Sequence, residues 1–450
     1  MPDWFSRDEA KRLTDRVLRF SRSDGCQVSL NSGIQGNTRS APGGISTSGD
    51  TWNATLTISS RFGKRRASVT TNVLDDAALR GAVENSERVA RLAPENPELM
   101  PLLGPQRYVE VAALFRSTIQ LDAAARAAAV KDTSDACQEA GLREAGFIHR
   151  SAGAECVANS AGLFAYHPST AVAHTLSVRT PEGDGSGWAG SWHNDWNKAL
   201  APAAVAERAI RKARGSRNAE ALVPGKYTVV LEPTAVANLL GLLTGAMNAR
   251  SADEGRSFFS KRGGGNKIGE KVVDERITIL SDPQDPDLLQ DPFDGEGQPI
   301  GRTVWIENGV VQNLVYDRFW ADKQGVPPRP QGGGIKLMGG EESVNQLITQ
   351  VERGLLVTRF WYIRGVDPRT ILYTGLTRDG VFLIENGKIT RPVRNFRFNE
   401  SPVAMLNNLV ALGKPERVSS SESGGLGGTA MMVPPVVARE FSFTSVSEAV

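Results

Sequence analysis

Cysteine and histidine are scarce in this chain. Its 450 residues include three cysteines and four histidines, which are Cys26, Cys137, Cys156, His149, His167, His174 and His193. Neither residue type occurs after His193. Catalytic zinc sites normally include imidazole or thiolate ligands. A zinc site made with cysteine or histidine is therefore excluded from the C-terminal half, and three separate cysteines fit a reducing compartment better than a disulfide framework.

Long hydrophobic runs and a strong net charge are also absent. No run approaches the roughly 18 consecutive apolar residues that cross a bilayer, and residues 1–9 lack the basic and then apolar pattern of a secretion signal. A net charge of +2 gives no reason to expect a nucleic acid partner. We therefore expect a cytoplasmic protein without a membrane or nucleic acid partner, long enough for two domains.

Residues 1–215 are predicted to form an N-terminal domain of helices on a mainly antiparallel sheet. Apolar and polar residues alternate over residues 51–60, as in a strand with one buried face. Residues 31–50 are rich in Gly, Ser, Thr and Asn. We expect a mobile loop there, and a second loop, dense in Gly and Trp, over residues 179–196.

Residues 225–450 are predicted to form a strand-rich C-terminal domain, which makes the fold class α+β. The pairs Asn308-Gly309 and Asn386-Gly387 each lie between apolar runs, a pattern that predicts a tight hairpin turn. A helix is expected over residues 234–248, where an apolar stripe fits burial against a sheet.

Five segments, taken together, point to a known family. They are Ser86–Pro97, Val229–Ala246, Gly269–Pro283, Phe293–Gly297 and Arg378–Gly387. Their sequences, order and spacing resemble those of the TldD/PmbA (TldD/TldE) family of modulators of peptide processing. The resemblance covers nearly the whole chain, and it implies a metallopeptidase-related fold.

The same resemblance implies that the zinc chemistry of the family is missing here. TldD-like members hold zinc with a His-Glu-x-x-x-His segment on a helix and a cysteine near the C-terminus. In this chain the two histidine positions fall on Gly241 and Ala246, and the glutamate position falls on Leu242. The segment where relatives place the cysteine, residues 419–428, contains only small residues apart from Glu422 and Leu426. We therefore expect no catalytic residue, no metal and no cofactor, and the helix over 234–248 is a degenerate zinc-motif helix.

Other residues are candidates for contact with a peptide or a partner. Trp188, Trp192 and Trp196 recur every four residues, and indole faces can hold an extended peptide without demanding one sequence. Alternatively, these rings cover the edge of the core or face a partner subunit. Asp253 and Arg256 follow the degenerate helix and could contribute to an acid–base or oxygen-ligated metal site instead.

The resemblance and the missing ligands together favour a noncatalytic TldE/PmbA-like subunit. Such a chain would pair with a zinc-bearing TldD-like partner in a heteromeric peptidase that trims unfolded or leader-type peptides. Two alternatives stay open, which are a stand-alone homodimeric protein that binds peptides and a peptidase with an unrecognised active site.

Overall fold

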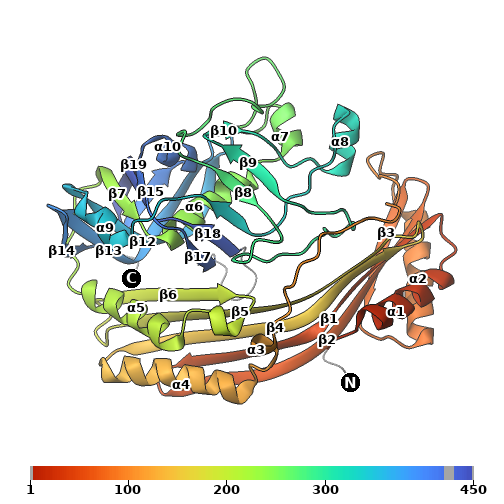
Figure 1. Cartoon of the computed structure of the whole chain (residues 1–450), viewed down its shortest axis with the longest axis horizontal. Coiled ribbons are helices and arrows are strands. Elements are labelled where there is room, and N and C mark those ends of the chain that lie inside the picture. The colour runs from red at the N-terminus through yellow and green to blue at the C-terminus, as the bar shows by residue number, and fades with distance from the viewer. Residues whose placement is uncertain (1–3, 420–429, 448–450) are drawn as a thin grey trace.

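The structure is a computed structural model that describes residues 4–419 and 430–447. Residues 4–215, called the N-terminal half below, form one antiparallel sheet with helices (Figure 1). The strands are β1 (Gly25–Ala41), β2 (Gly44–Phe62), β3 (Arg65–Thr71), β4 (Arg143–Asn159), β5 (Phe164–Arg179) and β6 (Ser186–His193). The helices are α1 (Arg7–Phe20), α2 (Asp76–Leu92), α3 (Arg116–Ile119), α4 (Ala123–Glu139), the 3-10 helix η1 (Trp196–Lys198) and α5 (Pro202–Gly215). The strand order is β3-β2-β1-β4-β5-β6, which makes β6 an edge strand.

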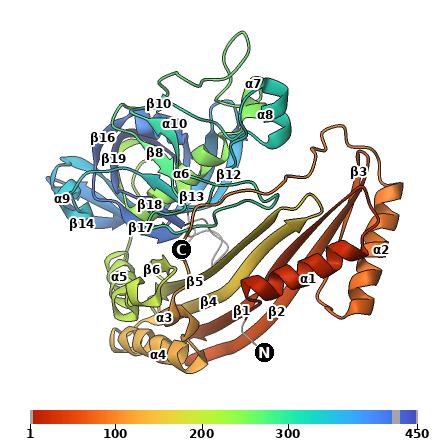
Figure 2. The ribbon, with the colours of Figure 1, turned by 45° about the vertical axis from the view of Figure 1, so that its right-hand side comes forward.

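The main helices of this half cover one face of its sheet. Val28 and Leu30 of β1 pack in a core with α1 and α2, whereas Val172 and Leu176 of β5 pack against α4 and α5 respectively. Figure 2 shows α1 and α2 at one end of the sheet and α4 at the other. The opposite face of β5 and β6 is left for the C-terminal half.

The loop predicted over residues 31–50 is wrong, because this segment belongs to the long strands β1 and β2. The two strands pair along nearly their whole length, and β1 also pairs with β4. Gly33 and Gly153 lie opposite each other, and a Cβ atom at either would be 2.5 Å from a backbone oxygen of the other strand. Glycine here permits close approach of two strands. The prediction of a loop over residues 179–196 is wrong in part, because this segment contains β6.

A buried arginine cluster stabilises the polar part of these strands. Arg126 of α4 is fully buried and donates hydrogen bonds of 3.1 Å to both carboxylate oxygens of Asp50 and to the hydroxyl of Thr38. Arg150 donates to the same carboxylate at 3.0 Å. Burial raises the pKa of Asp50, but the hydrogen bonds and charges of the two arginines outweigh it and lower this pKa. The cluster therefore fixes α4 against the far ends of β1 and β2.

Residues 225–447, called the C-terminal half below, contain two further sheets. The strands are β7 (Gly225–Leu231), β8 (Ile279–Ser281), β9 (Thr303–Glu307), β10 (Val310–Val311), β11 (Ile335–Leu337), β12 (Arg353–Asp367), β13 (Leu372–Glu385), β14 (Lys388–Val393), β15 (Phe396–Glu400), β16 (Leu409–Leu412), β17 (Glu416–Ser419), β18 (Ala430–Val433) and β19 (Val436–Val446). The helices are α6 (Pro233–Gly245), α7 (Ala249–Asp253), α8 (Arg318–Gln324), α9 (Val344–Thr349) and α10 (Pro402–Asn407).

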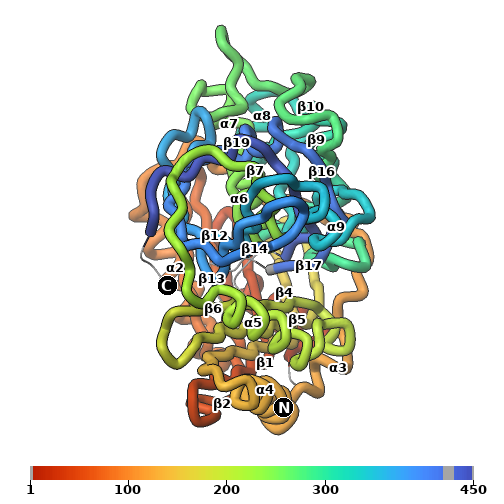
Figure 3. Tube along the Cα trace, turned by 90° about the vertical axis from the view of Figure 1, so that its left-hand side faces the viewer, coloured from red at the N-terminus to blue at the C-terminus, as the bar shows by residue number. Residues whose placement is uncertain are grey.

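The strand orders of this half are β10-β9-β8-β11-β18-β17 and β12-β7-β19-β15-β13-β14. In the second of these sheets β12 also pairs with β13, which closes a small barrel. Helix α6 contributes its apolar side chains to a core shared by strands of both sheets. Figure 3 shows this half stacked on the face of β5 and β6. The predicted α+β class, with an antiparallel N-terminal sheet and a strand-rich C-terminal part, is confirmed.

Two local predictions in this half can be compared with the backbone. The hairpin turns are confirmed, since Asn308-Gly309 has φ values of 48° and 78°, and Asn386-Gly387 has 50° and 72°. Positive φ at both central residues is the type I′ geometry. The predicted helix ends at Gly245, three residues early, because Asn248 caps the separate helix α7 by accepting from the backbone N–H of Ser251. No helix among the described residues is long and apolar enough to cross a membrane.

Acid is expected to destabilise the N-terminal half through His174. This imidazole lies in β5 between Val172 and Leu176, is 1% exposed, and its Nδ1 has no hydrogen-bond partner among the described residues. Burial lowers the pKa of His174 to about 4, whereas an unfolded histidine titrates near 6.5. Between these values the unfolded state binds more protons, so stability falls as the pH is lowered from about 6.5 to about 4.

The measurement is urea unfolding of His174→Leu and of the unmodified chain at several pH values in this window. We expect the variant to lose stability less steeply by about 1.4 kcal/mol per pH unit. His149→Leu is the control, because burial lowers the pKa of the partly exposed His149 by a smaller amount. Equal slopes for His174→Leu and the unmodified chain would contradict this prediction.

Candidate functional site

A cavity of about 570 Å³ lies between the two halves of the chain. Its N-terminal wall comes from β6 and α5. The C-terminal wall comes from the first turn of α6, from α9, and from parts of β12, β13, β14 and β17. The strands β6, β14 and β17 are each the last strand of a different sheet. The cavity therefore lies where three sheets present an edge.

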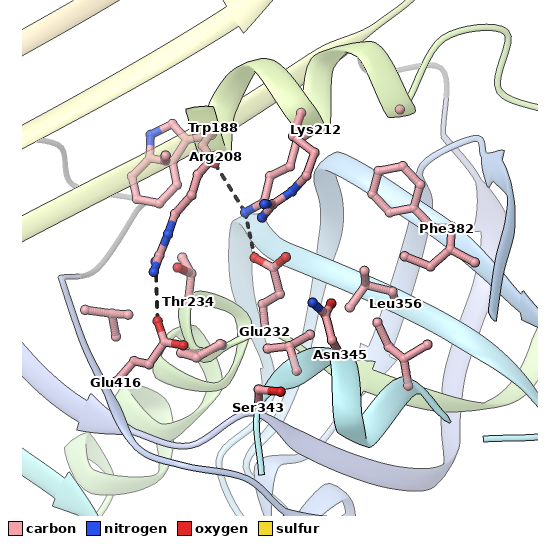
Figure 4. A pocket seen from close by; sticks show the side chains of 18 of the residues that line it. Trp188, Arg208, Lys212, Glu232, Thr234, Ser343, Asn345, Leu356, Phe382 and Glu416 are labelled. Atoms are coloured by element: carbon pink, nitrogen blue, oxygen red, sulfur yellow. Dashed lines mark hydrogen bonds and ion pairs between the residues drawn. The ribbon is translucent and has the colours of Figure 1, made fainter. Parts of the chain in front are cut away.

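Two ion pairs cross this cavity from α5 to the C-terminal half (Figure 4). The Nζ of Lys212 lies 2.6 Å from Oε2 of Glu232, the residue that precedes α6, and it also donates to the carbonyl of Trp188 at 3.4 Å. Nη1 of Arg208 lies 3.3 Å from Oε2 of Glu416 on β17. Lys212 is only 9% exposed, so its pair with Glu232 is screened little by solvent and ties α5 to the start of α6.

Local sequence explains how α6 reaches the cavity. Pro233 occupies the first helical position, where a missing N–H costs nothing and the fixed φ suits a helix. The rest of α6 is nearly all apolar, so the helix is buried on almost every side. Glu232 and Thr234 at its start face the cavity in Figure 4, while the later turns lie inside the core.

Of the positions that the resemblance aligns with the zinc-binding segment, Gly241 and Leu242 lie in the later turns of α6, and Ala246 directly follows the helix. A Cβ atom on Gly241 would be 3.3 Å from the methyl carbon of Met431 on β18, so a methionine side chain already occupies this side of the helix. Leu242 and Ala246 pack as partly buried hydrophobic residues against the core. These three residues offer no donor atom to zinc and do not fit the metal.

Other parts of the chain do not supply a replacement metal site within the structure described. Over residues 4–419 and 430–447, no group of three or more His, Cys, Asp or Glu side chains could hold a metal ion. Residues 420–428, nearly all of the segment where the resemblance implies a cysteine ligand, lie outside the described residues.

The structure brings together two of the three tryptophans. Trp188 and Trp192 lie on the same face of β6, toward the C-terminal half, and each is 7% exposed. Trp188 lines the cavity. The guanidinium of Arg359 lies 4.9 Å from its ring centre, and that of Arg417 lies 5.7 Å from the ring centre of Trp192. Trp196 packs elsewhere, against the core beside α4.

Asp253 and Arg256 do not line the cavity. Asp253 accepts hydrogen bonds from the indole N–H of Trp320 at 2.7 Å and from the amide of Asn266 at 2.8 Å. Arg256 bonds with the neighbouring Glu254. Both lie near α7, at the opposite end of the C-terminal half from α5 and β6 in Figure 1.

Sequence patterns did not single out the charged residues of the cavity. A usable signal exists only for Lys212, which falls within the buried stripe of α5 formed by Val205, Ala209 and Ala213. A lysine in such a stripe requires a carboxylate partner, but nothing in the local pattern identifies Glu232 as that partner.

Known proteins resemble this chain in both sequence and fold. Residues 224–445 match the PmbA/TldA metallopeptidase C-terminal domain, and residues 113–217 match the PmbA/TldA metallopeptidase central domain. The crystal structure of TldE from Thermococcus kodakarensis superposes with a TM-score of 0.82 at 19% identity, covering 96% of this chain and 99% of that one.

Two curated proteins show how far the sequence similarity extends. The metalloprotease PmbA of Escherichia coli O157:H7 is 27% identical over 206 residues, 44% of this chain and 44% of that protein. An uncharacterized protein of Methanocaldococcus jannaschii is 29% identical over 225 residues, 47% of this chain and 52% of that protein. The matched stretch thus spans about half the length of these relatives. The two domain matches together show that this chain belongs to the PmbA/TldD metallopeptidase family.

Proposed function

We propose that this chain is a noncatalytic, TldE/PmbA-like subunit of a heteromeric zinc peptidase. The observation that carries the proposal is the C-terminal end of α6 and the residue after it, where Gly241, Leu242 and Ala246 stand at the ligand and base positions and Met431 packs against Gly241. A side chain without donor atoms cannot bind zinc, and leucine cannot take a proton from a bound water. In this proposal the zinc and the cutting chemistry come from a TldD-like partner.

The cavity gives this subunit a second role in the proposal, which is to hold the peptide. Edge strands offer unpaired backbone groups to which an extended peptide can add, independent of most of its sequence. Trp188 and the apolar side chains of Leu356 and Phe382 supply contact area on opposite sides of the same cavity. Unfolded or leader-type peptides are the matching substrates, because their backbones are free to pair with a sheet edge.

Affinity purification of the tagged chain from its own cells tests the subunit role. We expect a chain of similar size that carries His-Glu-x-x-x-His to co-purify, as identified by mass spectrometry. Recovery of this chain alone, as a dimer by size-exclusion chromatography with light scattering, would contradict the proposal and favour the homodimeric peptide binder.

A peptidase assay of the purified chain tests the missing chemistry. Fluorescein-labelled casein should remain intact with the chain alone, even after zinc, manganese or cobalt is added, because α6 holds no ligand for any of these metals. Adding the co-purified partner should produce cleavage, which serves as the positive control. Metal-dependent cleavage by this chain alone would contradict the proposal and point to an unrecognised active site.

A further inference from the structure

A second pocket lies beside the basic turn between β2 and β3, at the other end of the N-terminal sheet from α5 (Figure 1). It has a volume of about 570 Å³ and is called the hairpin pocket below. The start of β1, the turn between β2 and β3, residues 99–102 and the turn between β4 and β5 line it. All of these segments belong to the N-terminal half, so the hairpin pocket is separate from the cavity between the two halves.

The hairpin pocket contains an arginine whose hydrogen-bonding capacity is largely unused. Arg61 lines the pocket, yet the residue is only 7% exposed. Its Nη1 donates to the carbonyl of Met100 at 2.6 Å, which holds the side chain in place. Its Nε is buried and has no hydrogen-bond partner among the described residues. Its Nη2 also makes no hydrogen bond within the described part of the chain, but this atom is not buried, so a ligand in the pocket can reach it.

The surroundings of this guanidinium do not neutralise it. Burial lowers the pKa of Arg61, and the charges of Arg66 and Arg318 lower it further, whereas Glu296 raises it in part. Glu296 is already paired with Arg318 at 2.9 Å. A guanidinium keeps its proton in proteins. Arg61 therefore presents a positive charge to the pocket without a carboxylate in direct contact among the described residues.

Two further hydrogen-bond donors line the hairpin pocket. Lys64 is exposed and donates to the carbonyl of Leu99 at 2.8 Å, which leaves two of its three ammonium protons free. The hydroxyl of Ser160 accepts from the backbone N–H of Cys26 at 3.0 Å, so its own proton is free for donation. Asp24 supplies the single carboxylate among the described lining residues. Donors and positive charge thus outnumber the acidic groups of this pocket.

We propose that the hairpin pocket binds the phosphate dianion of a small ligand. A carboxylate prefers two parallel N–H···O bonds from one guanidinium, and Arg61 cannot offer them because Nη1 is occupied and Nε is buried. A tetrahedral phosphate accepts separate hydrogen bonds from several directions, which matches single donors on Arg61, Lys64 and Ser160. The charges of Arg61, Lys64 and Arg66, less the one carboxylate of the lining, leave an excess of two, which a dianion neutralises.

Three probes distinguish a free phosphate from a phosphate ester. Leu99, Met100, Pro101 and Leu102 line the same pocket, so an apolar group attached to the phosphate would gain contact area. The probes are inorganic phosphate, phenyl phosphate and benzoate, at constant ionic strength and about pH 8, where both phosphates are dianions. By calorimetry, we expect one or both phosphates to bind the full chain about tenfold more tightly than benzoate. Tighter binding of phenyl phosphate identifies an ester, and tighter binding of inorganic phosphate identifies the free anion.

Two matched variants assign the binding to Arg61. In Arg61→Met the affinity for the preferred phosphate should fall about tenfold, because the charge and its N–H donors are lost while the apolar stem remains. Arg65→Met is the control, since Arg65 lies in the same hairpin, approaches Glu95 at 3.6 Å and does not line the pocket. Its affinity should change little. Equal losses in the two variants would indicate general attraction to a basic surface and would overturn the inference, as would equal binding of benzoate or no binding of either phosphate.

Thermal unfolding gives a second readout and shows whether the variants fold. Saturating amounts of the preferred phosphate should raise the Tm of the unmodified chain and of Arg65→Met, but not that of Arg61→Met. If Arg61→Met does not unfold cooperatively, Lys64→Gln/Ser160→Ala takes its place, because both residues are exposed in turns. We expect this double variant to bind the phosphate at least threefold more weakly. Unchanged affinity in the double variant would show that these donors do not contact a phosphate, and the inference would be wrong.

Discussion

Asp379→Asn is expected to lower the free energy of unfolding by about 3–5 kcal/mol, the usual cost of breaking a buried ion pair. Asp379 on β13 is 3% exposed and Arg359 on β12 is 7% exposed. Nε of Arg359 donates to Oδ2 of Asp379 at 2.6 Å. Burial lowers the pKa of Arg359, and the Asp379 charge raises it again in part. Loss of that charge removes a buried counter-charge from the guanidinium.

Asparagine isolates the electrostatic part of this effect. Asp379 has a φ of 56°, a left-handed conformation that asparagine tolerates well, so the substitution adds little backbone strain. Urea unfolding at neutral pH gives the free energy. In Arg359→Met/Asp379→Asn both charges of the pair are gone, and we expect most of the stability to return.

A surface ion pair provides the matched control for Asp379→Asn. Asp135 pairs with Lys131 at solvent-exposed positions of α4, so Asp135→Asn should change stability little. Similar losses in Asp379→Asn and Asp135→Asn would contradict the importance of burial. Arg359 also lies over Trp188 in the cavity wall, so the pair is expected to hold both the barrel and the interface between the two halves.

The sequence predicted those parts of the fold that depend on residues next to one another along the chain. Hairpin turns at Asn308-Gly309 and Asn386-Gly387 follow from backbone preferences of two residues, and the start of α6 follows from Pro233. The strands over residues 31–50 did not follow from such preferences. Their polar residues are stabilised by Arg126, which is 76 residues from Asp50 along the chain. A contact between residues so far apart cannot be predicted from local sequence patterns.

The cavity could not be predicted from local patterns either, because its ion pairs join residues that are far apart along the chain. Lys212 and Glu232 are 20 residues apart, and Arg208 and Glu416 are 208 residues apart. Each pair exists only because α5 packs on β6 while the C-terminal half covers the other face of the same sheet. Trp188, which the tryptophan spacing singled out, does line the cavity. A period of four residues fits a helix, however, and β6 instead places positions 188 and 192 on one face by alternation.

The packing of α5 on β6 leads to the second large effect, for Gly187→Ala. A Cβ atom at Gly187 would lie 2.1 Å from the carbonyl oxygen of Ala209 and 2.6 Å from the amide nitrogen of Ala213. Both atoms belong to the backbone of α5, which cannot rotate away as a side chain can. The helix must therefore withdraw from the sheet, and we expect a loss of about 3 kcal/mol in the free energy of unfolding, at the upper end of overpacking costs.

Gly49→Ala is the matched control, because Gly49 lies in β2 of the same sheet and has no atom within 4 Å of the added Cβ position. In Gly49→Ala the free energy of unfolding should change by less than about 1 kcal/mol. Equal effects of the two substitutions would contradict the packing explanation. Hydrogen exchange then locates the damage: faster exchange confined to α5 in Gly187→Ala would show that the sheet persists while the helix loosens.

Loosening of α5 would also affect the cavity between the two halves. Lys212 and Arg208 both extend from α5 to carboxylates of the C-terminal half, so withdrawal of the helix should weaken both ion pairs and widen the cavity. Under the proposed peptide-holding function, Gly187→Ala should then bind an unstructured six-residue peptide less tightly than Gly49→Ala does, as measured by calorimetry. Equal binding by the two variants would show that the packing of α5 on β6 does not set the shape of the peptide-holding cavity.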